Sequence, residues 1–238
     1  MTNYTIHNFD EIDSTMNYAK QLAENGCENF TVVTAKIQKN GRGRLERKWF
    51  SEQGGLYFTV VLKPKIAMDK AFVYNFAASL AIAATLKQLF KIDAKLKWPN
   101  DVHISGKKIC GILSEIKIDK DKIDYFNIGI GLNVNNQNFS SEINSVSVKQ
   151  LTEKRESAIK ILKTFLINFE KKTDPKRFDK IISEWKQNNI TIGGFVKVKT
   201  VNKTIEGAAI DIDRSGALVI VTDNFTVKKV ICGDCFHD

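Results

Sequence analysis

The first two-thirds of the chain alternate between short apolar runs and longer stretches in which apolar residues return every three or four positions. The short runs are rich in β-branched and aromatic residues, which is typical of buried strands. The longer stretches predict helices, one from Ser14-Thr15 to about Gly26 and a long one ending near Phe90. The predicted strands are 30–35, 55–62, 95–98, 102–104, 109–116 and 125–134, with a hairpin turn at Ser105-Gly106. Together these elements predict one mixed β-sheet with helices packed on it.

The last third of the chain has a different pattern. Residues 135–149 are polar and predict a loop, which is followed by two helical patterns at 158–169 and 178–185. Beyond residue 188 come closely spaced strands at 195–200, 205–212, 217–221 and 226–231, separated by Gly and Asp/Asn turns. This spacing predicts a small barrel. The predicted fold class is therefore α+β, with a large domain over residues 1–188 and a small β domain over residues 189–238.

Composition adds broad limits. The 238 residues are 43% hydrophobic and 26% charged, which is ordinary for a globular chain of one sizeable domain and a small second one. The formal net charge of +9 favours anionic partners, although lysine-rich surfaces also serve solubility. No signal peptide opens the chain, and its most apolar span, 72–90, is interrupted by polar residues. We expect a cytoplasmic protein with no membrane segment.

The cysteines indicate neither a disulfide framework nor a metal centre. Four cysteines in a chain of this length are expected to be reduced thiols. Cys232 and Cys235 have C-x-x-C spacing with His237 nearby, but the sequence lacks a second Cys/His pair to complete a tetrahedral zinc site. A thioredoxin-like role would place the motif at a helix start, whereas here it follows a strand-like run. We interpret these thiols as incidental and assign no metal-binding residue.

A Gly/Arg-rich segment separates two of the predicted strands. Residues 41–49 read G-R-G-R-L-E-R-K-W and so contain two glycines, four cations and Trp49. Glycine admits unusual backbone angles and bares its amide, while arginine pairs bidentately with phosphate or carboxylate. A solvated hairpin tip would also explain a loop here, but such a tip seldom concentrates four cations beside a tryptophan. The segment predicts a loop that closes over an anionic ligand.

Two further segments carry candidate chemistry. Lys97 precedes Trp-Pro-Asn-Asp, in which proline and the Asn/Asp pair make a turn without explaining the lysine. A lysine fixed at a strand end would supply positive charge to a reacting oxyanion or phosphate. Gly129 and Gly131 weaken a predicted buried strand unless they form a β-bulge or something flat approaches the backbone. Dinucleotide and P-loop fingerprints are absent, so the residues alone indicate an anionic ligand without identifying it.

In chain order these segments resemble the motifs of the biotin protein ligases. That family shows a Ser-Thr helix start, a Gln before a G-R-G-R-x-G-R loop, a K-W-P-N-D turn, a K-x-x-G-I-L strand and a G-x-G-x-N strand. The matching segments here are Ser14-Thr15, Gln38, 41–47, 97–101, Lys108–Leu113 and Gly129–Asn133, with a weaker C-terminal match through Gly207, 211–213 and 216–218. The resemblance implies a catalytic domain of the class II aminoacyl-tRNA synthetase/biotin ligase type and an SH3-like C-terminal barrel.

The resemblance also implies a two-step ligation. Biotin and Mg-ATP would form biotinyl-5′-AMP and pyrophosphate, and a lysine of the biotin carboxyl carrier protein of a carboxylase would then expel AMP. Lys97 and Arg44 would neutralise charge on the reacting phosphate. The implied biotin-binding residues are Ser14, Thr15, Gln38, Arg42, Gly111, Gly129 and Gly131, and the implied adenylate-binding residues are Arg42, Arg44, Arg47, Trp49, Lys97, Asn100 and Asn133. Trp49 would wall off the adenosine end.

Two positions depart from the family pattern. Glu46 replaces the third glycine of the loop, where it is expected to stiffen the loop or pair with Arg42 or Arg47, and Met16 replaces the usual Asn after Ser-Thr. The motifs begin almost at the first residue, which leaves no room for the N-terminal DNA-binding module of some members. We therefore expect no specific DNA binding. The sequence identifies neither the carboxylase acceptor nor the oligomeric state, and it leaves a homodimer through a sheet edge open.

Two other readings compete with biotin ligation. A lipoate or octanoate ligase or transferase would have the same fold, but the G-R-G-R and K-W-P-N-D segments favour biotin. A basic module for single-stranded nucleic acid would use the Gly/Arg loop and Trp49. Against it, most aromatic residues occur at core-like periods and are not interleaved with Lys and Arg.

Overall fold

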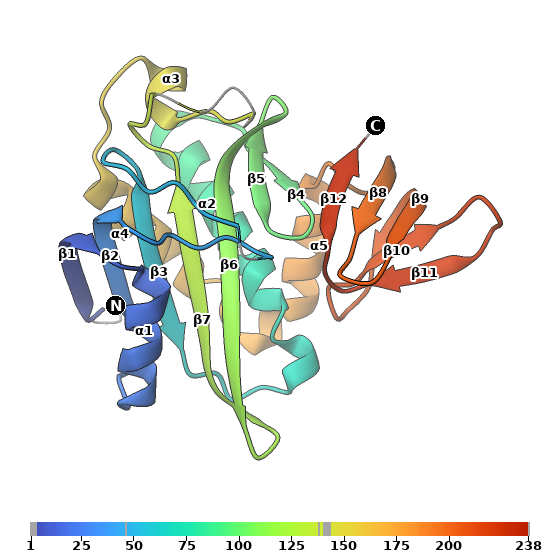
Figure 1. Ribbon diagram of the computed structural model, residues 1–238, viewed down its shortest axis with the longest axis horizontal. Helices are drawn as coiled ribbons and strands as arrows, with labels where there is room; N and C mark the ends of the chain where they lie inside the picture. Colours follow the sequence, from blue (N-terminus) through green and yellow to red (C-terminus); the bar gives the residue numbers. More distant parts are fainter. Residues whose placement is uncertain (1–3, 46, 138, 140–143, 238) are drawn as a thin grey trace. The chain divides into compact units, whose positions relative to one another are not determined.

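The computed structural model describes residues 4–45, 47–137, 139 and 144–237, and they group into two compact units (Figure 1). Unit 1 comprises Met1–Ala71 and Ile104–Thr164, and unit 2 comprises Phe72–His103 and Phe165–Asp238. The domain boundary expected at residue 188 stays a prediction. The two units are defined by contacts, and each combines two separate segments of the chain.

Unit 1 is built on a mixed β-sheet. Its strands are β1 (Ile6–Ile12), β2 (Thr31–Gln38), β3 (Leu56–Leu62), β6 (Lys107–Asp119) and β7 (Lys122–Leu132), in the spatial order β1-β2-β3-β7-β6. The β1/β2 pair is parallel and the other neighbouring pairs are antiparallel. Both faces of β3 are buried, which its run of apolar and aromatic residues requires.

Helix α1 (Thr15–Glu24) packs on one face of this sheet, against β2, β3 and β7 (Figure 1). Ala19 and Ala23 of the helix join Val33, Val61 and Tyr125 of the strands in one buried cluster. The small alanines allow the helix to approach the sheet closely. Unit 1 also contains the 3₁₀ helix η1 (Met68–Lys70), α3 (Val148–Thr152) and the first turns of α4 (Ala158–Glu170).

Unit 2 joins a helical pair to a second sheet. Helix α2 (Val73–Phe90) packs against α5 (Phe178–Asn188), which follows the 3₁₀ helix η2 (Pro175–Arg177). Phe76 stacks on Trp185 at a centroid distance of 4.5 Å, and the Trp185 indole donates to Ser79 Oγ at 3.1 Å. The short strands β4 (Lys95–Lys97) and β5 (Asp101–Ile104) form an antiparallel pair around the turn that carries Lys97.

The C-terminal strands form a five-stranded antiparallel sheet in unit 2. They are β8 (Phe195–Lys199), β9 (Thr204–Ile212), β10 (Leu218–Val221), β11 (Val227–Val230) and β12 (Asp234–His237), in the order β11-β10-β9-β8-β12. The expected small β domain is confirmed. Its strand order is that of an open sheet, with β11 and β12 at the edges, and in the described residues it does not close as a barrel.

Sequence patterning predicted most elements but missed, besides the 3₁₀ helices η1 and η2, two described strands and one short α-helix. The segment Ile6–Ile12 is the edge strand β1. The predicted loop 135–149 ends in α3, whose start is fixed by a capping box between Ser147 and Gln150, while residues 138 and 140–143 lie outside the described part. The C-x-x-C segment ends in β12. The missed strands and α3 are stabilised by tertiary pairing or capping more than by a hydrophobic period of their own.

Candidate functional site

Three glycines line one face of the unit 1 sheet between β7 and β6. Gly131 is paired with Gly111 across the strands, and Gly129 follows the same face of β7 two residues earlier. A Cβ atom at Gly131 would collide with the indole of Trp49, and one at Gly111 would lie 2.7 Å from it. A Cβ atom at Gly129 would lie 2.6 Å from Met16 Sδ. The glycines therefore allow flat or flexible groups to lie directly on the backbone, as the sequence suggested.

A chain of hydrogen bonds runs along the edge of this glycine surface. Thr59 Oγ1 on β3 donates to Thr15 Oγ1 at 2.9 Å. Both the backbone N–H and the hydroxyl of Thr15 donate to Gln38 Oε1, each at 2.9 Å. Gln38 Nε2 then donates to Ser51 Oγ at 2.8 Å, and Ser51 donates to the Trp49 carbonyl at 3.0 Å. The predicted residues Thr15 and Gln38 are thus held in fixed orientations at the start of α1 and the end of β2.

Two polar atoms at this surface are buried without a partner in the described part of the chain. They are Ser14 Oγ, whose residue is 1% exposed and precedes α1, and the indole Nε1 of Trp49. Leaving a buried donor or acceptor unpaired costs about 1–3 kcal/mol. Ser14 does not cap its helix, so helix formation does not account for it. A ligand with complementary polar groups would satisfy such atoms.

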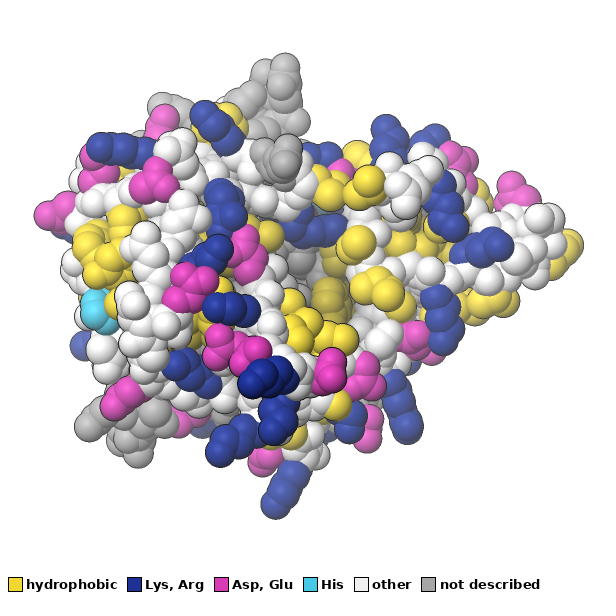
Figure 2. Space-filling model, turned by 60° about the horizontal axis from the view of Figure 1, so that its bottom comes forward, with side chains coloured by type: hydrophobic (Ala, Val, Ile, Leu, Met, Phe, Trp, Pro, Cys, Tyr) yellow, Lys and Arg dark blue, Asp and Glu magenta, His cyan; other side chains and the backbone are white. Residues whose placement is uncertain are grey.

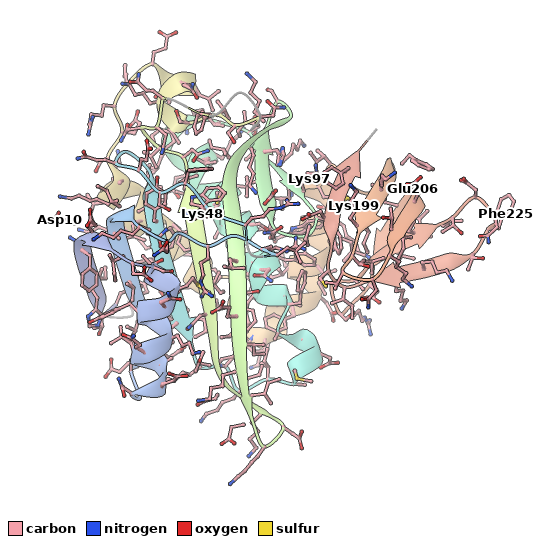
Figure 3. All side chains as sticks on the ribbon, viewed as in Figure 1. Asp10, Lys48, Lys97, Lys199, Glu206 and Phe225 are labelled. Carbon is pink, nitrogen blue, oxygen red and sulfur yellow. The ribbon has the colours of Figure 1, made fainter. Side chains whose placement is uncertain are left out.

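The Gly/Arg loop folds as a small hairpin. Residues Arg42 and Lys48 form an antiparallel bridge, and Gly43 N–H donates to the Arg47 carbonyl at 2.7 Å. Arg42 makes an ion pair with Glu115 of β6 at 2.8 Å, so it ties the loop to the sheet. Figure 3 labels Lys48 on this loop, where it is exposed, as is Arg47, whereas Arg44 is half-buried. Glu46, whose expected partners were Arg42 or Arg47, lies outside the described residues.

Lys108 is a site residue that the sequence analysis did not select. Its ammonium lies 5.3 Å from the centroid of the Trp49 ring, a cation–π distance. A Cβ atom at Gly111 would lie 3.3 Å from Lys108 Nζ, so this charge stands over the glycine surface. The sequence could have identified Lys108, because it is the first residue of the K-x-x-G-I-L segment, three residues before Gly111.

Asn133 has a structural role in the described fold. Its side-chain amide donates to the Val146 carbonyl at 3.2 Å, its backbone N–H donates to the Ile109 carbonyl, and its carbonyl accepts from Val148 N–H. It therefore holds the segment that leads into α3 against the end of β7. Its expected contact with the adenylate stays a prediction.

In unit 2, the turn after β4 is anchored by the C-terminal segment. Trp98 is 1% exposed, its backbone N–H donates to Thr191 Oγ1 at 2.9 Å, and its indole donates to the Gly216 carbonyl at 3.0 Å. Lys97, labelled in Figure 3, is half-buried at the end of the strand beside this anchor. Asn100 is half-buried on the turn itself. Two hydrogen bonds from buried Trp98, one from its backbone and one from its indole, therefore fix the turn next to the predicted catalytic lysine.

The carbonyl that Trp98 uses belongs to a turn organised by Asp213. Partial burial by itself raises the pKa of Asp213, but hydrogen bonds from the Ser215 hydroxyl, from Lys229 and from the N–H groups of Ser215 and Ala217 outweigh it and lower the pKa to about 2. Gly216 has φ +84°, and a Cβ atom there would collide with the Phe72 ring. Charge, backbone angle and space together fix the carbonyl of Gly216.

The described residues contain no group of three or more His, Cys, Asp or Glu side chains that could hold a metal ion. The four cysteines are free thiols, with Cys232 exposed and Cys235 buried in β12. Among the described helices, none is long and apolar enough to cross a membrane.

Comparison with known proteins identifies the family. The Biotin/lipoate A/B protein ligase family model matches residues 9–135, more than half of the chain, and the Biotin protein ligase C terminal domain model matches residues 191–238. Bifunctional ligase/repressor BirA of Bacillus subtilis is 33% identical over 233 residues, which cover 94% of this chain and 71% of the relative. Biotin--[acetyl-CoA-carboxylase] ligase of Paracoccus denitrificans is 28% identical, with 87% of this chain and 90% of the relative covered.

A solved structure agrees with these matches. Biotin protein ligase from Aquifex aeolicus in complex with biotin and ATP superposes with a TM-score of 0.83 at 28% identity, and 98% of each chain is covered. The chain therefore belongs to the biotin/lipoate A/B protein ligase family, and within it to the biotin protein ligases. The resemblance seen in its sequence motifs is confirmed.

Proposed function

We propose that this ligase activates biotin with ATP to biotinyl-5′-AMP and transfers the biotin to a lysine of the biotin carboxyl carrier protein of a carboxylase. The observation that carries the proposal is the glycine surface. There, buried polar atoms of Ser14 and Trp49, which have no hydrogen-bond partner among the described residues, adjoin the fixed pair Thr15–Gln38. Such a surface suits a flat bicyclic ligand with polar ring atoms.

The residues divide the surface into a neutral end and a cationic end. Ser14, Thr15 and Gln38 supply neutral donors and acceptors, which suit the ureido group of biotin. Trp49 and Lys108 lie over Gly111 and Gly131, so a carboxylate lying there would meet a positive charge. Arg44 and Arg47 of the neighbouring loop would bind the phosphate side of the adenylate.

Joining two anions requires charge to be neutralised at the α-phosphate. A rigid lysine performs this well because it needs no reorganisation as charge develops. Lys97, beside the anchored Trp98, has that rigidity, and Asn100 of the same turn is proposed to assist. Magnesium would enter with ATP as its substrate complex and supply positive charge to the phosphates.

The distribution of surface charges bears on whether the protein binds nucleic acid. The face of the molecule in Figure 2 shows Lys and Arg side chains interspersed with Asp and Glu, which does not suit a continuous track for nucleic acid. We therefore propose that any binding to DNA is non-specific and salt-labile. A titration with duplex DNA at low and moderate salt checks this, since sequence-selective binding that survives moderate salt would contradict it.

The test of function uses the purified chain with labelled ATP and a purified carrier domain. Biotin is expected to cause pyrophosphate release and then to appear on one carrier lysine, whereas lipoate or octanoate at the same concentration gives neither. A Ser14→Ala variant should need more biotin for half-maximal release and the same concentration of ATP. Equal turnover with lipoate would favour the lipoate ligase alternative, and no release with any of these acids would reject adenylation.

A further inference from the structure

Asn127 extends the glycine row of β7 by one step. It lies two residues before Gly129 and four before Gly131, so its side chain points to the same face of the sheet as the glycine surface. Its cross-strand neighbours are Val61 on β3 and Glu115 on β6. Asn127 thus borders the proposed ligand surface at the end opposite to Trp49.

The carboxamide of Asn127 is fully buried, and no described residue forms a hydrogen bond with it. The residue is 0% exposed, and neither Nδ2 nor Oδ1 forms a hydrogen bond within the described part of the chain. A buried amide normally has at least one partner, because removing it from water without compensation is costly. Asn133, the first residue beyond the other end of β7, follows this rule, since its amide donates to the Val146 carbonyl.

The surroundings of Asn127 limit where a partner can enter. Val61, Tyr125 and Ala19 form the apolar cluster under α1 on one side. Glu115 on β6 is already paired with Arg42. The remaining direction leads along β7 to Gly129, where the thioether of Met16 is the nearest side-chain group to a Cβ position. Methionine has three rotatable bonds, so Met16 can swing off Gly129 more easily than a branched or aromatic side chain could.

The chemistry of the amide matches one end of the proposed substrate. A carboxamide offers an N–H donor beside a carbonyl acceptor in one plane, and a ureido group offers the same two functions in the complementary order. The two can pair through two parallel hydrogen bonds. We propose that Asn127 is a specificity-determining residue that binds the ureido group of biotin once Met16 has moved off Gly129. This inference rests on the proposed function.

The unpaired amide has opposite effects in the two states of the protein. In the free protein the buried amide lowers the stability of the fold, and in the complex its hydrogen bonds increase the affinity for biotin. Replacing it with leucine, which has a similar shape, removes both effects. The Asn127→Leu variant should therefore unfold at an equal or higher temperature than the parent and bind biotin less well.

The kinetic test measures pyrophosphate release by Asn127→Leu over a range of biotin and ATP concentrations. Loss of two neutral hydrogen bonds predicts a rise of about tenfold to a hundredfold in KM for biotin, with kcat and KM for ATP unchanged. The KM for desthiobiotin, which keeps the ureido ring, should rise by the same factor. A KM for biotin within twofold of the parent would overturn the inference and would indicate a buried water or an uncompensated amide.

The control is Thr34→Val on β2. Thr34 is also buried and polar, but its hydroxyl donates to the Tyr57 carbonyl at 3.1 Å and it points to the opposite face of the sheet. The Thr34→Val variant should be less stable than the parent and have the same KM for biotin. Equal rises in KM for biotin in both variants would show a general packing effect and contradict a specific role.

A second measurement uses the parent protein, so it does not depend on whether a variant folds. In the parent protein labelled with ¹⁵N-asparagine, biotin should shift the side-chain amide signal of Asn127 and slow its exchange with solvent, and ATP alone should not. An Asn127 signal unchanged at saturating biotin would overturn the inference. If the parent releases no pyrophosphate with biotin and the signal is also unchanged, the proposed function fails together with this inference.

Discussion

The Gly/Arg loop of unit 1 and the Lys97 turn of unit 2 are both rich in candidate chemistry, but the structure holds them in different ways. The turn is anchored by the buried Trp98, whose backbone and indole both donate hydrogen bonds to the C-terminal segment. The loop folds as a short hairpin tied to the sheet by the Arg42–Glu115 ion pair, its Trp49 is half-buried, and its Arg47 and Lys48 side chains are exposed. A fixed charge suits stabilisation of a reacting phosphate, and a surface loop with exposed cations suits closure over an anionic ligand.

This difference assigns separate tasks to the two cationic segments. Chemistry should depend on the turn, because a preorganised charge acts without moving. Retention of the activated intermediate should depend on the loop, because an acyl-adenylate reacts with water or any amine that reaches it. Variants of the two segments should therefore fail in different kinetic steps.

The largest effect is expected from Lys97→Ala. Loss of a charge-stabilising donor costs roughly a hundred- to a thousandfold in rate, while stability should change little because the lysine is only half-buried. Pyrophosphate release and a thermal unfolding curve measure the two quantities. Lys95→Ala, an exposed lysine on the same strand, is the control and should retain activity. Near-normal release by folded Lys97→Ala would remove the lysine from the mechanism.

A smaller, kinetically distinct effect is expected from Arg44→Gly in the loop. This change removes a cation and adds backbone entropy to the closed state, so it weakens closure by about 1.5–3 kcal/mol. The variant should still make the adenylate, release it at least tenfold faster, and label lysines of bystander proteins. The dissociation rate of bound adenylate measures this, with Arg155→Gly, an exposed arginine outside the loop, as control. Equal rates in parent and Arg44→Gly would show that Arg44 does not hold the loop closed.

Thr191→Val tests whether the C-terminal segment fixes the turn. Valine keeps the shape of threonine but leaves the buried Trp98 N–H without its acceptor, a loss of about 1–3 kcal/mol. The melting temperature should fall by about 2–4 °C for each kcal/mol lost, and adenylate formation should slow without a change in adenylate release. Thr204→Val, at an exposed position of β9, is the control. Faster adenylate release in Thr191→Val would contradict the separation of tasks.

The smallest effect concerns the pH dependence of the Asp213 turn. The pKa of Asp213 is lowered from 3.8 to about 2 in the folded state, so its carboxylate stabilises the fold above pH 4 and loses that contribution as the pH falls toward 2. Asp213→Asn should therefore be less stable than the parent at pH 7, by a difference that shrinks between about pH 4 and pH 2. Urea unfolding at several pH values measures it. A difference independent of pH in this window would exclude the charge as its source.

The sequence by itself determined the periodic elements, the order of the motifs and the family. Strand β3 is an unbroken run of apolar, β-branched and aromatic residues and helix α2 is a long apolar stretch, so the composition of each segment identifies it. Residues matched to motifs, such as Thr15, Gln38 and Gly131, were found because their spacing along the chain is itself the signal. The edge strands β1 and β12 escaped, since an edge strand is defined by the neighbour that it pairs with.

Tertiary structure alone decided which residues meet across distant parts of the chain. Lys108 lies over Trp49, and Gly216 accepts a hydrogen bond from Trp98, although 59 and 118 positions separate the members of each pair. The burial of an amide without a partner at Asn127 is likewise invisible in sequence, where an asparagine in a strand is only an unfavourable residue. Local periodicity reports the solvent exposure of one segment, whereas hydrogen bonding and burial depend on the atoms that folding brings from other segments.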